Sequence, residues 1–166
     1  MPRVPDPVPG LVFRYDYLRP RLQEKGVEHP KERPARILLV LEPGEVLTGA
    51  ILIDETSGKT VVDFAARSDD VVIFPIQSDP PAKDQLGIEL GIETKTYIGL
   101  PGDKPSWAII SEVNVDRWPS PGLARVPGTD EFAYPRRLPG PLLSGITKRF
   151  LQLREKKLVR ALTRHP

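Results

Sequence analysis

The chain has 166 residues, enough for one domain with its own core, and it carries a net charge of +2, no cysteine and two histidines. These counts exclude a disulfide framework and argue against a zinc site or a Ser-His-Asp triad, because only His29 and His165 could supply imidazole. No apolar run reaches the roughly 20 residues of a membrane span, and the start of the chain lacks the apolar segment of a signal peptide, so we expect a cytoplasmic protein without membrane contact, metal or cofactor.

Proline marks the first part of the chain. Residues 1–9 carry a proline at every second or third position and are predicted to form an extended arm, followed by a single domain over residues 10–166. The alternating stretch Gly10–Tyr15 predicts the first strand. A long polar loop with a short helical turn near residues 18–25 should then lead to an apolar core strand, Ala35–Leu41.

The middle of the chain favours short strands joined by turns. Val46–Asp54 is predicted to pair with a second strand across a turn at Thr56–Lys59, which makes residues 46–69 an extra hairpin. Val71–Ile76 is also typical of a strand. Because Pro75 has no backbone N–H to donate, we expect it near the end of this strand or at a sheet edge.

Further strands are expected before the C-terminal region. Gln85–Leu90 and Thr94–Gly99 carry weak strand patterns, whereas Trp107–Asn114 alternates clearly enough for one continuous strand. The last segment differs, because its apolar residues recur with helical spacing. We therefore predict a helix over about residues 141–163, and it carries most of the seven basic residues found in residues 140–166.

Many short strands followed by one late helix predict a mainly β, α+β domain. The expected architecture is a compact, mostly antiparallel barrel or curled sheet with the C-terminal helix packed on it. The basic residues of that helix have two interpretations, a solvated helix face or contact with an anionic partner.

A short basic segment directly precedes the predicted core strand. Arg33, with Lys31 two residues earlier, would lie at the mouth of the strand that begins at Ala35. A guanidinium fixed in this position could bind two phosphate oxygens, since its planar fork matches their spacing. The alternative is an ordinary surface arginine beside a loop proline.

Polar side chains are also expected at two other strand ends, and these are Gln77, Ser78, Asp79, Glu112 and Asn114. If the strand ends converge, the group suits metal-independent cleavage of RNA. The ribose 2′-OH can be the internal nucleophile, so the protein need only assist proton transfer and stabilise the charged transition state. The alternatives are turn-forming residues and a solvated carboxylate.

Aromatic and basic residues near the N-terminus suggest a surface for nucleic acid. Arg14, Tyr15 and Arg19 bring basic and aromatic side chains together in this segment. Trp118, which stands beside prolines, could stack on a base. Packing of these aromatic rings in the core or at an interface is the alternative.

The order of these motifs resembles the PemK/MazF toxin family, and in particular a branch of longer PemK-like proteins often seen in proteobacteria. The similarity runs from about Gly10 to Leu153. The pieces that carry it are Gly10–Tyr15, Glu32–Pro34 before an apolar strand, Phe74–Ser78, Ser106–Asn114, Arg117–Pro119, Val126–Gly128 and Phe132–Tyr134.

The resemblance implies a small SH3-like barrel, a homodimer, and the toxin of a type II toxin–antitoxin pair that cleaves single-stranded RNA without a metal. It also implies a cognate antitoxin whose tail blocks the RNA groove, and it makes Arg33 the group that assists at the scissile phosphate. Family members place a threonine or serine directly after the Pro-Ile step. Gln77 stands there in this chain and Ser78 follows, so both are candidate catalytic residues.

Two other functions stay open on the sequence. One is a non-catalytic module that binds RNA or protein on the same barrel, which the presence of Gln77 favours. The other is a toxin that acts on a protein target such as a topoisomerase, with the basic C-terminal helix as part of the partner surface.

Overall fold

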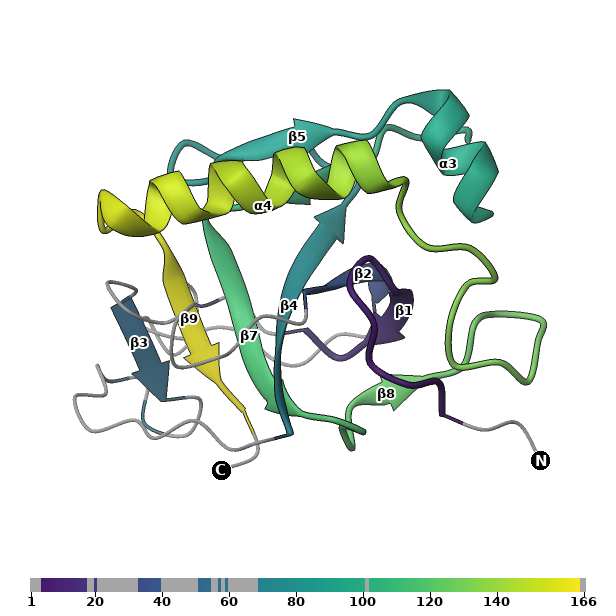
Figure 1. Cartoon of the computed structure of the whole chain (residues 1–166), viewed down its shortest axis with the longest axis horizontal. Coiled ribbons are helices and arrows are strands. Elements are labelled where there is room, and N and C mark those ends of the chain that lie inside the picture. Colours follow the sequence, from purple (N-terminus) through teal and green to yellow (C-terminus); the bar gives the residue numbers. More distant parts are fainter. Residues whose placement is uncertain are drawn as a thin grey trace.

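The computed structural model describes residues 4–17, 20, 33–39, 51–54, 57, 59, 69–100 and 102–164. Within this part the chain is a mixed α+β fold, mostly strands, in which a curled sheet forms half of a barrel and a long helix lies across one face (Figure 1). In chain order the elements are β1 (Val12–Tyr15), β2 (Arg33–Leu39), β3 (Ile51–Asp54), β4 (Asp70–Gln77), β5 (Gly87–Glu89), α3 (Ile92–Ile98), β6 (Trp107–Ile109), β7 (Glu112–Arg117), β8 (Leu123–Ala124), α4 (Gly140–Glu155) and β9 (Arg160–Thr163).

The strand order along the sheet is β3-β9-β7-β4-β2-β1-β8, with β5 and β6 paired beside β4. Most neighbours are antiparallel, as predicted. The exception is β9, which runs parallel to both of its neighbours, β3 and β7. The last described strand of the chain therefore lies inside the sheet instead of at its edge, and α4 belongs to the crossover connection that returns the chain to this position.

The central strand β4 contains Pro75, which was expected at a strand end or an edge. It lies two residues before the end of β4 but not at an edge, because β4 pairs with β2 on one side and with two strands in succession on the other. Pairing with β7 covers Asp70 to Ile73, and pairing with β6 begins at Ile76. Pro75 falls in the gap between them, where a missing N–H breaks no registered pair on that side.

The segment Trp107–Asn114 is two strands, so the prediction of one continuous strand was wrong. The break lies at Ile110 and Ser111. The N–H of Ile110 donates to the carbonyl of Leu86 at 2.8 Å, and the hydroxyl of Ser111 accepts from the N–H of Leu86 at 2.9 Å. At these two contacts the chain leaves the ladder of β6 and enters the ladder of β7.

The weak strand predicted at Thr94–Gly99 is the helix α3. Lys95 and Ile98 are its buried residues, which fits a helical spacing of three. The helix ends at Gly99, which adopts the left-handed conformation with φ of 102°. The N–H groups of Gly99 and Leu100 both donate to the carbonyl of Lys95 at 2.9 Å, so the glycine closes the helix as a C-terminal cap.

The long helix is shorter than predicted, and its expected last turns form β9. α4 ends at Glu155, and Lys157 then takes a positive φ of 60°. Leu158 is exposed while Leu162 is buried in β9, although both were assigned to one helical face. The reason is tertiary: as a strand, residues 160–163 gain backbone hydrogen bonds to a neighbour on each side.

Several other predictions lie partly or wholly outside the described residues. These are the helical turn at residues 18–25, the end of the core strand at residues 40–41, and the first half and return strand of the hairpin at residues 46–69. The described part of that hairpin, β3, pairs with β9. The N-terminal arm is described from Val4, and the carbonyl of Pro5 accepts a hydrogen bond from the indole N–H of Trp118 at 2.9 Å.

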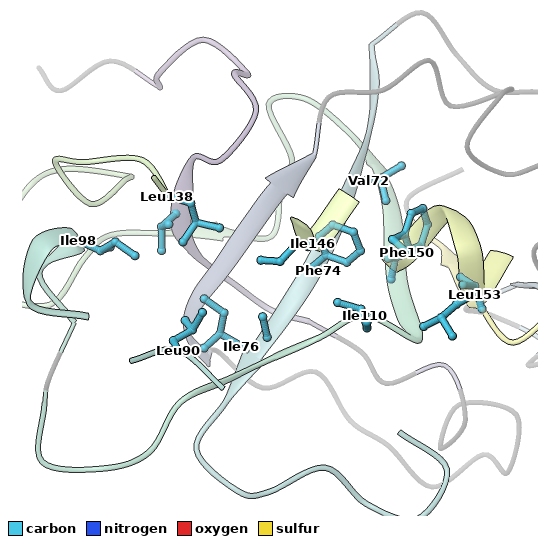
Figure 2. Packing of buried hydrophobic residues seen from close by; sticks show 14 of the residues in the cluster. Val72, Phe74, Ile76, Leu90, Ile98, Ile110, Leu138, Ile146, Phe150 and Leu153 are labelled. Atoms are coloured by element: carbon cyan, nitrogen blue, oxygen red, sulfur yellow. The ribbon is translucent and has the colours of Figure 1, made fainter. Parts of the chain in front are cut away.

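The larger hydrophobic core lies between the sheet and α4 (Figure 2). Alternate residues of β4 face it, and Phe74 meets Phe150 of α4 edge to face with ring centroids 5.0 Å apart. The opposite face of the sheet holds a second, smaller cluster that includes Phe13, Ile73 and Trp118. Among the described residues no helix is long and apolar enough to cross a membrane.

Replacement of Phe150 by alanine should remove the main anchor of α4, because the ring is fully buried against Phe74. We expect a loss of about 3–5 kcal/mol in the free energy of unfolding, measured by chemical denaturation. The matched control is Gln152→Ala, an exposed position of the same helix, which should change stability by no more than about 0.5 kcal/mol. Equal losses in the two variants would contradict the packing of α4 described here.

Candidate functional site

The start of β2 and the end of β4 lie at the same end of the sheet, because the two strands are antiparallel neighbours. Arg36 pairs with Pro75 and Ile37 with Phe74 in an antiparallel ladder. The ladder between the two strands ends at Arg36 and Pro75. Arg33 stands three residues before Arg36 in β2 and Ser78 stands three residues after Pro75, so both lie beyond the same end of this ladder. Only the backbone of Arg33 is described, and Lys31 and Arg19 lie outside the described residues.

The side chain of Gln77 is held by a reciprocal amide pair with Gln85. Nε2 of Gln77 donates to Oε1 of Gln85 at 3.2 Å, and Nε2 of Gln85 donates back to Oε1 of Gln77 at 3.3 Å. Nε2 of Gln77 also reaches the carbonyl of Asp79 at 3.0 Å, and Oε1 of Gln85 accepts the N–H of Ala82 at 2.9 Å. The pair thus closes the loop that follows β4. Gln77 holds this loop in place, and its amide has few hydrogen-bonding positions left for a substrate.

Ser78 and Asp79 are exposed on that loop. The hydroxyl of Ser78 makes no hydrogen bond to any other described residue, which leaves it available to a ligand. The neighbouring carboxylate of Asp79 also faces solvent. Of the residues predicted at this strand end, these two are accessible and Gln77 is committed to the loop.

Glu112 and Asn114 do not lie on an RNA-accessible surface, contrary to the prediction. Both are buried, and Asn114 is fully so. They project from the same face of β7, opposite the face that packs on α4, where Nε2 of Gln85 lies 3.5 Å from Oε1 of Glu112. A side chain without exposed surface cannot orient a bound RNA in this conformation.

Tyr15 and Trp118 are also interior residues, so the alternative of structural packing holds for both. Tyr15 is completely buried, and Trp118 meets Phe13 edge to face at 5.3 Å between ring centroids. Neither ring presents a face to a base.

The indole N–H of Trp107, which lies opposite Gln77 across the β4–β6 pair, is buried without a hydrogen-bond partner in the described structure.

Arg14 is half-buried beside Tyr134. Its guanidinium forms a hydrogen bond with the phenol, which together with the positive charge lowers the pKa of Tyr134, but burial outweighs this and the net pKa is raised. Arg14 therefore already has a partner within the protein, and contact with RNA would have to share its donors.

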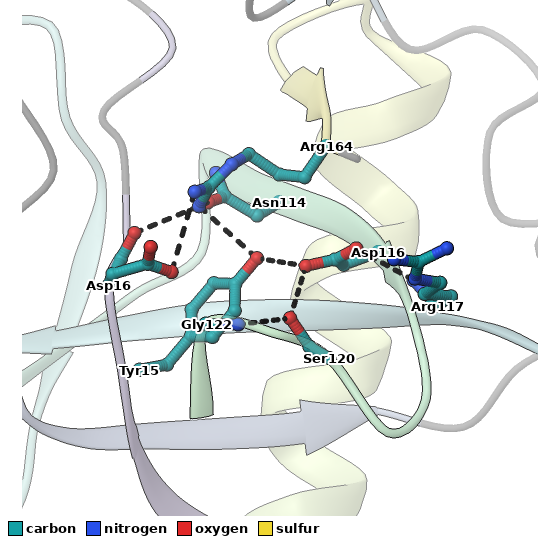
Figure 3. A network of polar contacts seen from close by, with 8 residues as sticks. All are labelled: Tyr15, Asp16, Asn114, Asp116, Arg117, Ser120, Gly122 and Arg164. Atoms are coloured by element: carbon teal, nitrogen blue, oxygen red, sulfur yellow. Dashed lines mark hydrogen bonds and ion pairs between the residues drawn. The ribbon is translucent and has the colours of Figure 1, made fainter. Parts of the chain in front are cut away.

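A second polar group, mostly buried, centres on the guanidinium of Arg164 (Figure 3). Arg164 is 2% exposed, and its Nη1 donates to the hydroxyl of Tyr15 at 3.2 Å, to the carbonyl of Asp16 at 2.8 Å and to Oδ1 of Asn114 at 3.1 Å. Its Nη2 lies 3.4 Å from Oδ1 of Asp16, an ion pair without hydrogen-bond geometry. The guanidinium carbon also lies 5.2 Å from the centre of the Tyr15 ring.

The carboxylate of Asp116 completes this network. Oδ2 accepts hydrogen bonds from the hydroxyls of Tyr15 and Ser120, each at 2.6 Å, and Oδ1 accepts the N–H of Arg117 at 2.8 Å. The hydroxyl of Ser120 in turn accepts the N–H of Gly122 at 3.0 Å. The network joins the end of β1, the middle of β7 and the residue that follows β9.

Burial raises the pKa of Tyr15 well above its usual range. The positive charge of Arg164 works in the opposite direction, and the nearby carboxylate of Asp116 adds to the increase. Tyr15 is therefore a neutral hydrogen-bond donor at physiological pH. Tyr15, Asn114, Asp116, Ser120 and Arg164 are all buried, so we assign the network a structural role.

Sequence reasoning missed Gln85, Asp116, Ser120 and Arg164. None of them follows a motif, and Arg164 was counted as one of several basic residues on a helix. Their roles arise from segments far apart in the chain. No group of three or more metal-ligating acidic or histidine side chains occurs in the described part of the chain.

The variant Tyr15→Phe tests the network through its pH dependence. The folded pKa of Tyr15 is raised above its unfolded value of about 10, so its stabilising contribution is complete below that pH and is lost as the pH rises, by about 1.4 kcal/mol per pH unit. Denaturation at several pH values should show a weaker alkaline loss in Tyr15→Phe than in wild type. Near pH 7 the variant should lose about 1–3 kcal/mol.

Tyr134→Phe provides the control for this measurement. Burial also raises the pKa of Tyr134, but its hydroxyl bonds to Arg14 and lies outside the network. An alkaline dependence that is identical in wild type and Tyr15→Phe would contradict the buried network.

No protein-family model, no curated protein and no solved structure matches this chain. The functional argument therefore depends on the residues and on their arrangement.

Proposed function

We propose that the chain is a metal-independent endoribonuclease for single-stranded RNA, the toxin of a type II toxin–antitoxin pair. One observation carries the proposal: the antiparallel pairing of β2 with β4 ends at Arg36 and Pro75, and Arg33 and the exposed Ser78 both lie beyond that end. The order of motifs and the curled sheet support the same family. In this proposal the sheet is an SH3-like barrel that acts as a homodimer and is inhibited by a cognate antitoxin.

The proposed reaction uses the 2′-OH of the substrate as nucleophile. The 2′-oxygen forms a bond to phosphorus while the bond from phosphorus to the 5′-oxygen breaks, which leaves a 2′,3′-cyclic phosphate and a free 5′-OH. The guanidinium of Arg33 would stabilise the negative charge that develops on the non-bridging oxygens. Ser78 would donate a hydrogen bond to the phosphate, the exposed carboxylate of Asp79 would accept the 2′-OH proton, and the departing 5′-oxygen would take a proton from water.

Gln77 has a different role in this scheme. Its amide holds the loop through Gln85 and through the carbonyl of Asp79. The hydroxyl expected at its position in the family is thus supplied one residue later, by Ser78. We therefore propose Gln77 as a positioning residue and Ser78 as the group that contacts the substrate.

A non-catalytic RNA-binding module on the same barrel is the second candidate. The burial of Glu112 favours it, because it removes a carboxylate that could have assisted proton transfer. Cleavage assays separate the two candidates, since both bind RNA and only the first cuts it.

Arg33→Ala should lower cleavage by about 10²- to 10³-fold, because the transition state loses its main positive charge. The measurement is induced expression followed by mapping of RNA 5′ ends, together with a rate on purified RNA. Arg117→Ala is the matched control, an exposed arginine at the opposite end of β4, where Asp70 pairs with it. Intact RNA and normal growth on expression of the wild type would refute the ribonuclease.

Ser78→Ala should lower kcat by about 10²-fold and leave thermal stability unchanged, because the hydroxyl has no partner in the described part of the protein. Ser78→Thr keeps a hydroxyl and should retain most of the activity. Gln85→Leu provides the contrast, since it should lower the melting temperature by opening the loop. If Ser78→Ala cleaves at the wild-type rate, the assignment of the hydroxyl is wrong.

A further inference from the structure

The face of α4 that points away from the core carries positive charge. Ile146, Phe150 and Leu153 are buried against the sheet. On the exposed side Lys148, Arg149, Gln152 and the C-terminal cap residue Lys156 follow one another at spacings of one, three and four residues, which places them on one face of the helix. The helix thus has one apolar face and one basic face.

Within the described part of the protein, the cations of this face have no acidic partner. Lys148, Arg149 and Lys156 form no ion pair with any described residue, and the one acidic residue of α4 is Glu155. Lys157, which is also exposed, extends the charge beyond the end of the helix. A set of exposed cations with no internal partner raises the local potential and attracts a polyanion.

An exposed aromatic ring belongs to α3, which lies at the N-terminal end of α4, the end opposite Lys156 (Figure 1). Tyr97 of α3 is 47% exposed, and the guanidinium of Arg136 lies 4.9 Å from the centre of its ring. Arg136 and the exposed Arg137 stand shortly before the first residue of α4, and α3 lies at that end of the helix in Figure 1. Single-stranded nucleic acid is commonly held by this combination, a basic track for the phosphates and aromatic or guanidinium planes for the bases.

We propose that the exposed face of α4 binds the phosphate backbone of single-stranded RNA, with Tyr97 and Arg136 as a stacking platform at its beginning. This inference rests on the proposed function and extends it, because it adds a contact for substrate outside the strand edge that holds Arg33. The positive charge of this face complements the negative charge of the phosphate backbone, and this identifies RNA as the ligand.

A protein partner fits the same surface less well. The centre of a protein interface is usually anchored by buried aromatic or other large side chains. The exposed positions of α4 from Gly145 to Glu155 carry no aromatic residue and no large apolar one, and the exposed Leu158 follows after the helix has ended. The surface is suited to a ligand that is recognised by its charge.

The test measures how RNA affinity depends on salt. The triple variant Lys148→Gln, Arg149→Gln and Lys156→Gln removes three cations from the face and keeps good helix formers. The probe is a mixed-sequence single strand with 2′-O-methyl groups, which lacks the nucleophile and therefore cannot be cleaved. The slope of log K against log salt should fall by about 2, since each phosphate contact on a single strand contributes about 0.7.

The matched control removes the same charge elsewhere. Lys59→Gln, Lys104→Gln and Arg117→Gln alter three exposed positions outside α4, and this variant should keep the wild-type slope. Tyr97→Ala should weaken binding with little change in slope, because it removes stacking and no charge. Melting curves of all variants show that the comparison is between folded proteins.

The outcomes separate this inference from the proposed function. If wild type cleaves RNA and the α4 variant has the slope of the control, the inference is wrong and the ribonuclease stands. If wild type binds no RNA, both fail. If the α4 variant binds RNA normally but loses binding to a polyglutamate peptide, the face serves an acidic protein segment and the inference is overturned.

Discussion

The buried guanidinium of Arg164 is the interaction on which the rest of the arrangement depends. A charge removed from water is tolerated only when its donors are satisfied and its charge is balanced. Arg164 meets this requirement through Tyr15, Asp16 and Asn114, which come from the other end of the chain and from the middle of the sheet. Its position follows directly from the insertion of β9 between β3 and β7. The network therefore ties both ends of the described chain to the sheet centre.

The sheet separates the polar residues of this chain into two environments. One is the interior face, where Arg164 pairs with Asp16 and is linked through the hydroxyl of Tyr15 to Asp116. The other is the edge formed by the start of β2 and the end of β4, where Ser78 is exposed. Because chemistry on a polymer needs an accessible site, the proposed activity belongs to the edge, and the interior network supplies the rigidity that keeps the strands in register.

The helix α4 connects the core with the proposed binding surface. Its apolar face packs on Phe74 and its neighbours, and this fixes which residues of the helix face solvent. The cations Lys148, Arg149 and Lys156 are then presented together as a consequence of the packing. A shift of the helix by one residue would distribute them between core and solvent, which is strongly unfavourable for a charged side chain.

The sequence by itself determined the mainly β class, the positions of β1, β2 and β4, and the existence of a late amphipathic helix, because these depend on local periodicity. It also singled out Arg33 and Ser78 as candidate site residues, since polar residues beside apolar runs are visible in the chain. Only the tertiary structure decided that Tyr15, Asn114 and Trp118 are interior, that residues 94–99 are helical and that residues 160–163 form a central strand. These outcomes depend on hydrogen-bond partners and packing surfaces supplied by distant segments, and local pattern carries no information about which distant segment will supply them.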